Sequence, residues 1–230
     1  MALIKSTAIP SGATDYELEQ SLRFNDDDSA YLSWTPASAG NRRTWTWSCW
    51  VKRGAKIGSY EWLFSANNTC KIAFNGNSIN MYHGSELVTT QVFRDPSAWY
   101  HIVVAYDSTQ STSSNRLKIY VNGEQVTVFT YSVYPPLNYE SYLNSAVVTQ
   151  IGHNASRSGH FHGYMAETNF IDGQQLTSAD FGETGTYGEW KPIEYSGTYG
   201  TNGFYLPFKQ DYTVEGFSAT TYTGNGSNNY

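Results

Sequence analysis

Two glutamates near the start of the chain, Glu17 and Glu19, are of the residue type that glycoside hydrolysis uses. Residues two apart point to the same face of a strand, so the pair would share one surface. Hydrolysis needs two carboxyl groups about 5–5.5 Å or 6.5–9.5 Å apart across a sugar. Both residues fall in a segment, 1–20, that we expect to form an arm outside the folded core. We therefore expect that they are not a catalytic pair and that the chain is not an enzyme.

Three histidines lie close together in the sequence: His153, His160 and His162. His160 and His162 would share one strand face, and such imidazole pairs, repeated around a symmetry axis, would coordinate a transition metal. The simpler interpretation is a polar strand edge with both rings in water. We expect no metal here.

Acidic residues are dense at two places, the run Asn25–Asp28 and Asp172. Calcium takes six to eight hard oxygen ligands, which carboxylates supply. A run of Asp in a tight turn more often bonds local backbone N–H groups. We expect no cofactor, with calcium at these residues as the open alternative.

Sugar binding would need aromatic rings for the apolar sugar face and amides or charged groups for the hydroxyls. Six residues carry suitable groups: Trp34, Trp62, Tyr82, His83, Asn154 and Arg157. Aromatic side chains are also enriched at subunit contacts, so contacts between chains are the alternative interpretation of the same residues.

The composition excludes several kinds of partner. The chain has 230 residues, 15% of them charged, and a net charge of -6. An acidic chain with scattered Lys and Arg lacks the basic surface that nucleic acid requires. No apolar run approaches the roughly 20 residues that cross a bilayer, and the opening MALIKSTAIPSG has no apolar core of a secretory signal. We expect neither nucleic-acid binding, nor membrane insertion, nor export.

The elements that must position these residues are short strands joined by tight turns. Asn-Gly pairs, at Asn75-Gly76 and Asn122-Gly123, are the strongest short-range hairpin signal. One helical turn is expected at Thr177–Asp180, and no longer helix. The expected strands are 21–24, 30–34, 45–52, 61–65, 70–74, 78–82, 86–93, 99–106, 117–122, 124–129, 147–152, 161–171 and 203–208.

The pattern predicts an all-β antiparallel sandwich at residues 21–182. An N-terminal arm, 1–20, precedes it, and a Gly- and Tyr-rich segment, 183–230, returns one strand to it. Cys49 and Cys70 fall on the faces that we expect to be buried, as two apolar thiols. A disulfide between adjacent strands is the alternative for them.

Three ordered segments resemble the core of laminin-G-like and concanavalin A-like jelly rolls. They are TWTWSCWVKRG (44–54), WYHIVVAYD with LKIYVNGEQV (99–126), and IGHN with FHGYMAETNFIDGQQLT (151–177). The resemblance implies a jelly roll of about a dozen strands, in a fold that usually binds or builds. The Glu-x-Asp-x-x-Glu string of the related glucanases is absent. Ala166 precedes Glu167 where the family often has Asp, which weakens any inherited calcium site.

Two further segments, SLRFNDDDSAYLS (21–33) and WKPIEYSGTYGTNGFYLPF (190–208), are similar to virion proteins of marine tailed bacteriophages. This resemblance implies a non-enzymatic structural or adhesion protein on a tail fibre, appendage or head. Its partners would be other virion proteins, further copies of itself, as a trimer, and a host surface glycan. The location would be the virion, assembled in the host cytoplasm, with the arm 2–20 adding to a neighbour's sheet.

Three alternatives remain open at this point. The first is a free carbohydrate-binding, lectin-like module, whose site would work in a single chain. The second is a glycan hydrolase that uses Glu17 and Glu19. The third is a decoration protein without any ligand, which would form a symmetric oligomer.

Overall fold

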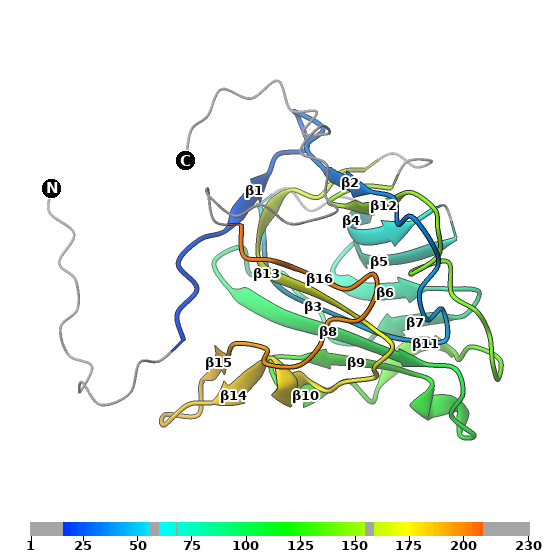
Figure 1. Ribbon diagram of the computed structural model, residues 1–230. Helices are drawn as coiled ribbons and strands as arrows, with labels where there is room; N and C mark the ends of the chain where they lie inside the picture. The colour runs from blue at the N-terminus through cyan, green and yellow to red at the C-terminus, as the bar shows by residue number, and fades with distance from the viewer. Residues whose placement is uncertain (1–15, 56–59, 68, 155–158, 209–230) are drawn as a thin grey trace, which may run out of the picture.

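Figure 1 shows the computed structural model, which describes residues 16–55, 60–67, 69–154 and 159–208. Two antiparallel sheets of seven strands each face one another, and a pair of short strands lies beside the first sheet. The only helices in these residues are two short 3-10 turns, η1 (Ser113–Asn115) and η2 (Ser178–Asp180). The prediction of an all-β sandwich is confirmed. Neither helix is long and apolar enough to cross a membrane.

The first sheet has the order β1-β13-β3-β8-β9-β10, with β16 also paired to β13. Strands β1 and β16 share one edge of β13, because β3 occupies the whole of its other edge. The strands of this sheet are β1 (Leu22–Phe24), β3 (Thr44–Arg53), β8 (Trp99–Asp107), β9 (Leu117–Val121), β10 (Glu124–Gln125), β13 (Gly163–Asp172) and β16 (Phe204–Leu206).

The second sheet has the order β11-β7-β6-β5-β4-β12-β2. A separate hairpin, β14 (Gly182–Thr184) with β15 (Trp190–Pro192), forms the two-stranded sheet. The strands of the second sheet are β2 (Leu32–Trp34), β4 (Tyr60–Ala66), β5 (Cys70–Asn75), β6 (Ser78–Tyr82), β7 (Glu86–Thr89), β11 (Phe129–Val133) and β12 (Thr149–Ile151).

The core lies between the two sheets and follows from alternation along the strands. In β3, Trp45, Trp47, Cys49 and Val51 all point inward and are fully buried, because successive side chains of a strand face opposite sides. Trp47 stacks on Phe64 of the second sheet with ring centroids 5.9 Å apart. The residues of β3 that alternate with Trp45, Trp47, Cys49 and Val51 therefore face away from the core.

Both cysteines are buried and unpaired, as the interpretation as two buried thiols predicts. Cys49 lies in β3 of the first sheet and Cys70 in β5 of the second, so the alternative of a disulfide between adjacent strands is wrong. Burial raises the pKa of each thiol to about 12. The two thiols are therefore unreactive parts of the core.

The hairpin prediction at Asn122-Gly123 is borne out by the backbone, since both residues have positive φ, 48° and 90°. The strand expected at 124–129 is wrong in its extent. Strand β10 ends at Gln125, and the chain crosses to the second sheet to form β11. The strand expected at 86–93 ends at Thr89, because the chain turns inward and Phe93 fills the core.

The outer face of the first sheet is partly covered by the chain that follows β13. Phe181 packs there on Val103, Ala105, Tyr120 and Ile171, which face away from the main core. At the expected helical turn, the backbone N–H of Thr177 donates to the Asp180 carboxylate at 2.8 Å. This covering segment ends in β15, which forms one side of the site described next.

Candidate functional site

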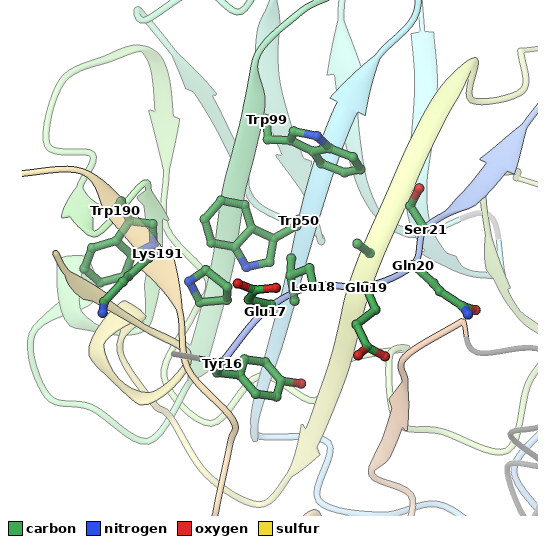
Figure 2. A pocket seen from close by; sticks show the side chains of 12 residues that line it. Tyr16, Glu17, Leu18, Glu19, Gln20, Ser21, Trp50, Trp99, Trp190 and Lys191 are labelled. Carbon is green, nitrogen blue, oxygen red and sulfur yellow. The ribbon is translucent and has the colours of Figure 1, made fainter. Parts of the chain in front are cut away.

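A pocket of about 510 Å³ opens on the outer face of the first sheet (Figure 2). We call it the indole pocket because three tryptophans contribute to its wall. It is lined by Tyr16, Glu17, Leu18, Glu19, Gln20, Ser21, Trp50, Trp99, Ala166, Trp190, Lys191 and Pro192.

The three indoles come from three strands. Trp50 lies on β3 and points outward, because it alternates with the buried Trp47 and Cys49. Trp99 begins β8, and Trp190 begins β15. Two neighbouring strands of the sheet and the hairpin above it therefore supply the aromatic surface.

His101 joins two of these indoles. The Nε1–H of Trp190 donates to Nδ1 of His101 at 2.9 Å, and the Trp50 ring stacks on the imidazole with centroids 4.9 Å apart. Burial lowers the pKa of His101 to about 3, so the ring is neutral at pH 7. The part of the pocket wall formed by Trp50 and Trp190 on His101 therefore carries no charge.

Ser48 and His101 have the residue types of a nucleophile and its base, with Oγ and Nε2 2.8 Å apart. An indole N–H can only donate, so Nδ1 of His101 must accept from Trp190 and Nε2 must carry the proton. The imidazole then donates to Ser48 and has no lone pair left to take a proton from it. This pair positions Trp190 and is not a nucleophile with its base.

The opposite wall of the pocket is the segment Tyr16–Ser21, which we call the strap. The strap has no regular secondary structure, and its side chains lie on the same side of the sheet as Trp50 and Trp99 (Figure 2). We expected residues 1–20 to form an arm outside the core. Of that arm, residues 1–15 lie outside the described residues, and 16–20 rest on the sandwich.

The structure places Glu17 and Glu19 in the lining of the pocket, where they were not expected. Both are exposed, and the strap is not a strand, so the spacing of two does not put them on one strand face. In Figure 2 the two carboxylates point to different sides of the strap. They supply hydrogen-bond acceptors and negative charge, without the opposed arrangement that hydrolysis needs.

A cluster of two tyrosines and a glutamate holds the start of the strap. The hydroxyls of Tyr16 and Tyr205 both donate to Oε1 of Glu167, at 2.7 and 2.5 Å, and lie 2.9 Å from each other. We call these three residues the clasp. Burial, together with the neighbouring Glu167 carboxylate, raises the pKa of both tyrosines above the usual range. The hydroxyls therefore stay protonated as donors.

Glu167 lies at an irregularity of β13, where the register against β3 shifts between Ala166 and Asn169. Its φ of 51° is in the left-handed region, which is uncommon for a residue other than glycine. The bulge breaks the alternation of β13 here. It sets Glu167 beside β16 and next to the pocket-lining Ala166.

The only cation in the pocket lining, Lys191, lies 3.2 Å from the Glu183 carboxylate. The described lining thus contains two carboxyl side chains, Glu17 and Glu19, and one ammonium group. The pocket is consequently acidic as well as aromatic.

The three histidines are not arranged as a metal site. His153 and His160 stack on each other with centroids 4.0 Å apart and planes 4° apart, whereas Nδ1 of His162 lies 2.7 Å from an Asp26 carboxylate oxygen. His160 and His162 therefore have separate partners. Within the described ranges, no group of three His, Cys, Asp or Glu side chains is placed to hold a metal ion.

The Asn25–Asp28 run forms a turn. Ser29 N–H donates to the Asp26 carbonyl at 3.1 Å, and Nδ2 of Asn25 donates to the Asp28 carboxylate at 2.6 Å. Both bonds are local to the turn, but neither joins an Asp side chain to a backbone N–H group. Calcium there stays the open alternative.

Asp172 accepts hydrogen bonds from three segments. Its carboxylate receives the N–H of Asn41 at 2.8 Å, Nδ2 of Asn144 at 2.6 Å and the N–H of Asn202 at 3.1 Å. These donors join three loops to the end of β13. The protein therefore supplies hydrogen-bond donors to both oxygens of this carboxylate.

Of the six residues expected at a sugar site, the five that the structure describes are not gathered in one place. Trp62 and Tyr82 lie near each other on the second sheet, with the Lys71 ammonium 5.1 and 4.6 Å from their rings. Trp62 is fully buried, and Tyr82 is 36% exposed. Trp34 packs edge-on against Phe204 at 5.5 Å.

The other three residues expected at a sugar site are His83, Asn154 and Arg157. His83 is fully buried and packs edge-on against Tyr106 and Tyr139, with centroids 5.1 and 5.2 Å away. Asn154 is also fully buried, and Arg157 lies outside the described residues. A sugar-binding role for the six stays a prediction, and the site argued below uses other residues.

Sequence reasoning missed Trp50, Trp99 and Trp190. One signal was present, since Trp50 has the opposite strand parity to Trp45 and Trp47 and must face outward if they face the core. Nothing in the sequence placed Trp190 above it, because that contact depends on how the chain after β13 folds back.

The fold defines the class of protein, a jelly-roll β-sandwich. Residues 26–180 match a laminin G family model whose description is concanavalin A-like lectin/glucanases superfamily. The chain therefore belongs to this superfamily. A search of curated protein sequences gives no match.

Several solved structures share the general architecture at low identity. Mouse laminin alpha1 domains LG4-5 are 9% identical with a TM-score of 0.47, covering 84% of this chain and 48% of that one. A SAP-like pentraxin from Limulus polyphemus is 11% identical with a TM-score of 0.48, and the match covers 71% of this chain and 80% of that one. Domain 4 of the Geobacillus stearothermophilus arabinanase AbnA, in complex with arabinotriose, is 17% identical with a TM-score of 0.44, and the match covers 62% of this chain and 66% of that one. The chain spans about half of the laminin structure and just under two-thirds of the arabinanase domain.

Proposed function

We propose that this chain is a non-enzymatic glycan-binding module and that the indole pocket is its binding site. The observation that carries the proposal is the presence of Trp50, Trp99 and Trp190 around one open pocket that is edged by carboxylates. Indole faces stack on the apolar face of a sugar, while carboxylates and amides accept hydrogen bonds from its hydroxyls. Membership of a superfamily whose description names both lectins and glucanases supports a glycan as the ligand.

The charge of the pocket favours neutral glycans over acidic ones. Glu17 and Glu19 would repel a uronic acid or a sialic acid, and Lys191 is already paired with Glu183. The net charge of -6 acts in the same direction at longer range. We infer that the ligand is a neutral oligosaccharide.

A glycan array with the purified chain tests this proposal. We expect binding to neutral glycans that falls about tenfold or more in Trp99→Ala, because a stacking face is lost. Tyr131→Ala is the matched control, since Tyr131 is 51% exposed on β11, in the second sheet, and should not affect binding. Unchanged glycan binding in Trp99→Ala would show that the indole pocket is not the binding site.

The absence of catalysis is part of the proposal. Ser48 is not activated by His101, and the strap carboxylates point apart. We expect no reducing sugar to be released from polysaccharides that bind. Release that disappears in the double variant Glu17→Gln, Glu19→Gln would instead support the hydrolase alternative.

A virion adhesion role is a second candidate. Of the two segments similar to phage virion proteins, 21–33 supplies β1 and part of β2, and 190–208 supplies β15 and β16. Ser21 of the first segment and Trp190, Lys191 and Pro192 of the second line the pocket. A trimer presenting three weak pockets would gain strength by avidity, in a particle assembled in the host cytoplasm. Mass photometry tests this role, since a monomer would favour the free lectin-like module.

A further inference from the structure

The strap lies on the outward face of the first sheet, where Trp50 and Ala166 also line the pocket (Figure 2). Trp50 of β3 and Ala166 of β13 are paired directly in register, and Trp99 of β8 pairs with Lys52, two residues further along β3. These three strands are adjacent and about 4.8 Å apart, so their outward faces form one surface about 10 Å across. Ala166 is only 2% exposed at this surface, and the strap is the opposite wall of the pocket there.

The strap is attached at both of its ends, and the side chains between them are mostly polar. Leu18 is its only aliphatic side chain, and the four remaining residues after Tyr16 are polar and exposed. Tyr16, at its start, is anchored by the clasp, whereas its other end continues directly into β1. Among the described residues, the clasp is therefore an attachment at the start of the strap, and the pairing of β1 with β13 is the attachment at its other end.

We propose that the strap is a movable wall of the binding site, and that the Tyr16–Glu167–Tyr205 clasp keeps it closed. With the clasp closed, the site is a pocket that takes the end of a glycan or a short oligosaccharide. With the clasp open, the outward faces of β8, β3 and β13 form a groove that takes the interior of a longer chain. This inference rests on the proposed function for its ligand, but the movement of the strap does not depend on any ligand.

The left-handed backbone conformation at Glu167 places its carboxylate where the clasp can form. The bulge in β13 brings the carboxylate to a point that both Tyr16, before β1, and Tyr205, on β16, can reach. A carboxylate that accepts two tyrosine hydroxyls makes charge-assisted hydrogen bonds, which are stronger than neutral ones. Loss of one such bond changes an opening equilibrium by about tenfold or more.

The first measurement is hydrogen–deuterium exchange without ligand. We expect the amides of the strap to exchange about tenfold faster in Tyr16→Phe and in Tyr205→Phe, with exchange in β3 and β8 unchanged. Tyr195→Phe is the matched control, because the Tyr195 hydroxyl donates to the Thr198 carbonyl at 3.1 Å and that bond involves no clasp residue. Strap exchange that matches the control in both clasp variants would overturn the proposal.

The second measurement is affinity for cello- and chito-oligosaccharides of increasing length. We expect Tyr205→Phe to bind the longer members several-fold more tightly than the natural chain does, with little change for the shortest member that binds. An equal change at all lengths would show that no groove opens, and would also overturn the proposal.

The two proposals fail in different ways. If no oligosaccharide binds to any variant, and the glycan array is also empty, the proposed function fails. The movement of the strap is then tested by two measurements that need no ligand. One is hydrogen–deuterium exchange, and the other is acrylamide quenching of tryptophan fluorescence, which should increase in the clasp variants as Trp50 is uncovered. Unchanged exchange together with normal glycan binding would leave the proposed function standing and remove the movable wall.

Discussion

Arg53 and Glu61 form a two-point ion pair inside the protein, with Nε–Oε2 and Nη2–Oε1 distances of 3.2 and 2.7 Å. Arg53 ends β3 of the first sheet, and Glu61 lies at the start of β4 of the second. Two further guanidinium N–H groups reach the carbonyls of Phe93 and Gly76, at 2.7 and 2.9 Å. The pair therefore joins the two sheets with nearly all its hydrogen-bonding groups satisfied.

Removing one partner of this ion pair should be costly. We expect Glu61→Gln to lower the free energy of unfolding by about 3–5 kcal/mol, because it leaves the guanidinium charge buried without a counter-ion. Urea unfolding monitored by tryptophan fluorescence measures the change. Glu140→Gln is the matched control, since that carboxylate pairs with Arg42 and Arg43 at the surface and is 47% exposed. It should cost less than about 1 kcal/mol, and equal effects would contradict this account.

Two buried histidines predict a dependence of stability on pH. Burial lowers the pKa of both His83 and His101 to about 3, from an ordinary value of 6.5. Between these values the unfolded chain binds more protons than the folded one, so stability is complete above about pH 6.5 and falls as the pH falls. Each histidine should contribute about 1.4 kcal/mol per pH unit within that range.

Urea unfolding at several values between pH 6.5 and 5 checks this slope. The variant His83→Phe should lose the His83 share of the slope, about 1.4 kcal/mol per pH unit. The replacement stays aromatic and keeps the packing against Trp45, Tyr106 and Tyr139. A slope that stays the same in this variant would show that His83 does not titrate as proposed.

Trp190→Phe tests the hydrogen bond that positions the pocket wall. The variant keeps an aromatic ring but leaves Nδ1 of His101 buried without its donor, so we expect a loss of about 1–3 kcal/mol in the free energy of unfolding. Glycan affinity should fall as well, because Trp190 lines the pocket. Trp99→Ala should reduce affinity with a smaller effect on stability, since Trp99 is only partly buried. A larger loss of stability in Trp99→Ala than in Trp190→Phe would contradict the role of the Trp190–His101 hydrogen bond.

The strap carboxylates should determine which glycans are rejected. In the double variant Glu17→Gln, Glu19→Gln, we expect affinity for uronic-acid oligosaccharides to rise several-fold at low salt, because like-charge repulsion is removed. Affinity for neutral oligosaccharides should change much less. Isothermal titration at low and high salt separates the two effects, and a rise that is insensitive to salt would argue against an electrostatic cause.

Much of the sandwich could be predicted from local patterns. The alternation in 45–51 and the Asn-Gly turns identify buried faces and hairpins, because side-chain direction in a strand and positive φ in a turn depend on a few neighbouring residues. The ends of β7 and β10 could not be predicted. They are set by where the chain leaves one sheet to fill the core or to enter the other.

The sequence by itself determined the class of fold, the burial of Trp45 and Trp47, and the acidic character of the chain. It did not determine which aromatic side chains form a site. Tyr16, Glu167 and Tyr205 are far apart along the chain, and Trp190 meets His101 across 89 positions. Only the packing of β13 against its neighbours and the return of the chain over the first sheet decide these contacts. The physical reason is that strand pattern is a local property, whereas a pocket is formed by segments that meet only after the sheets have assembled.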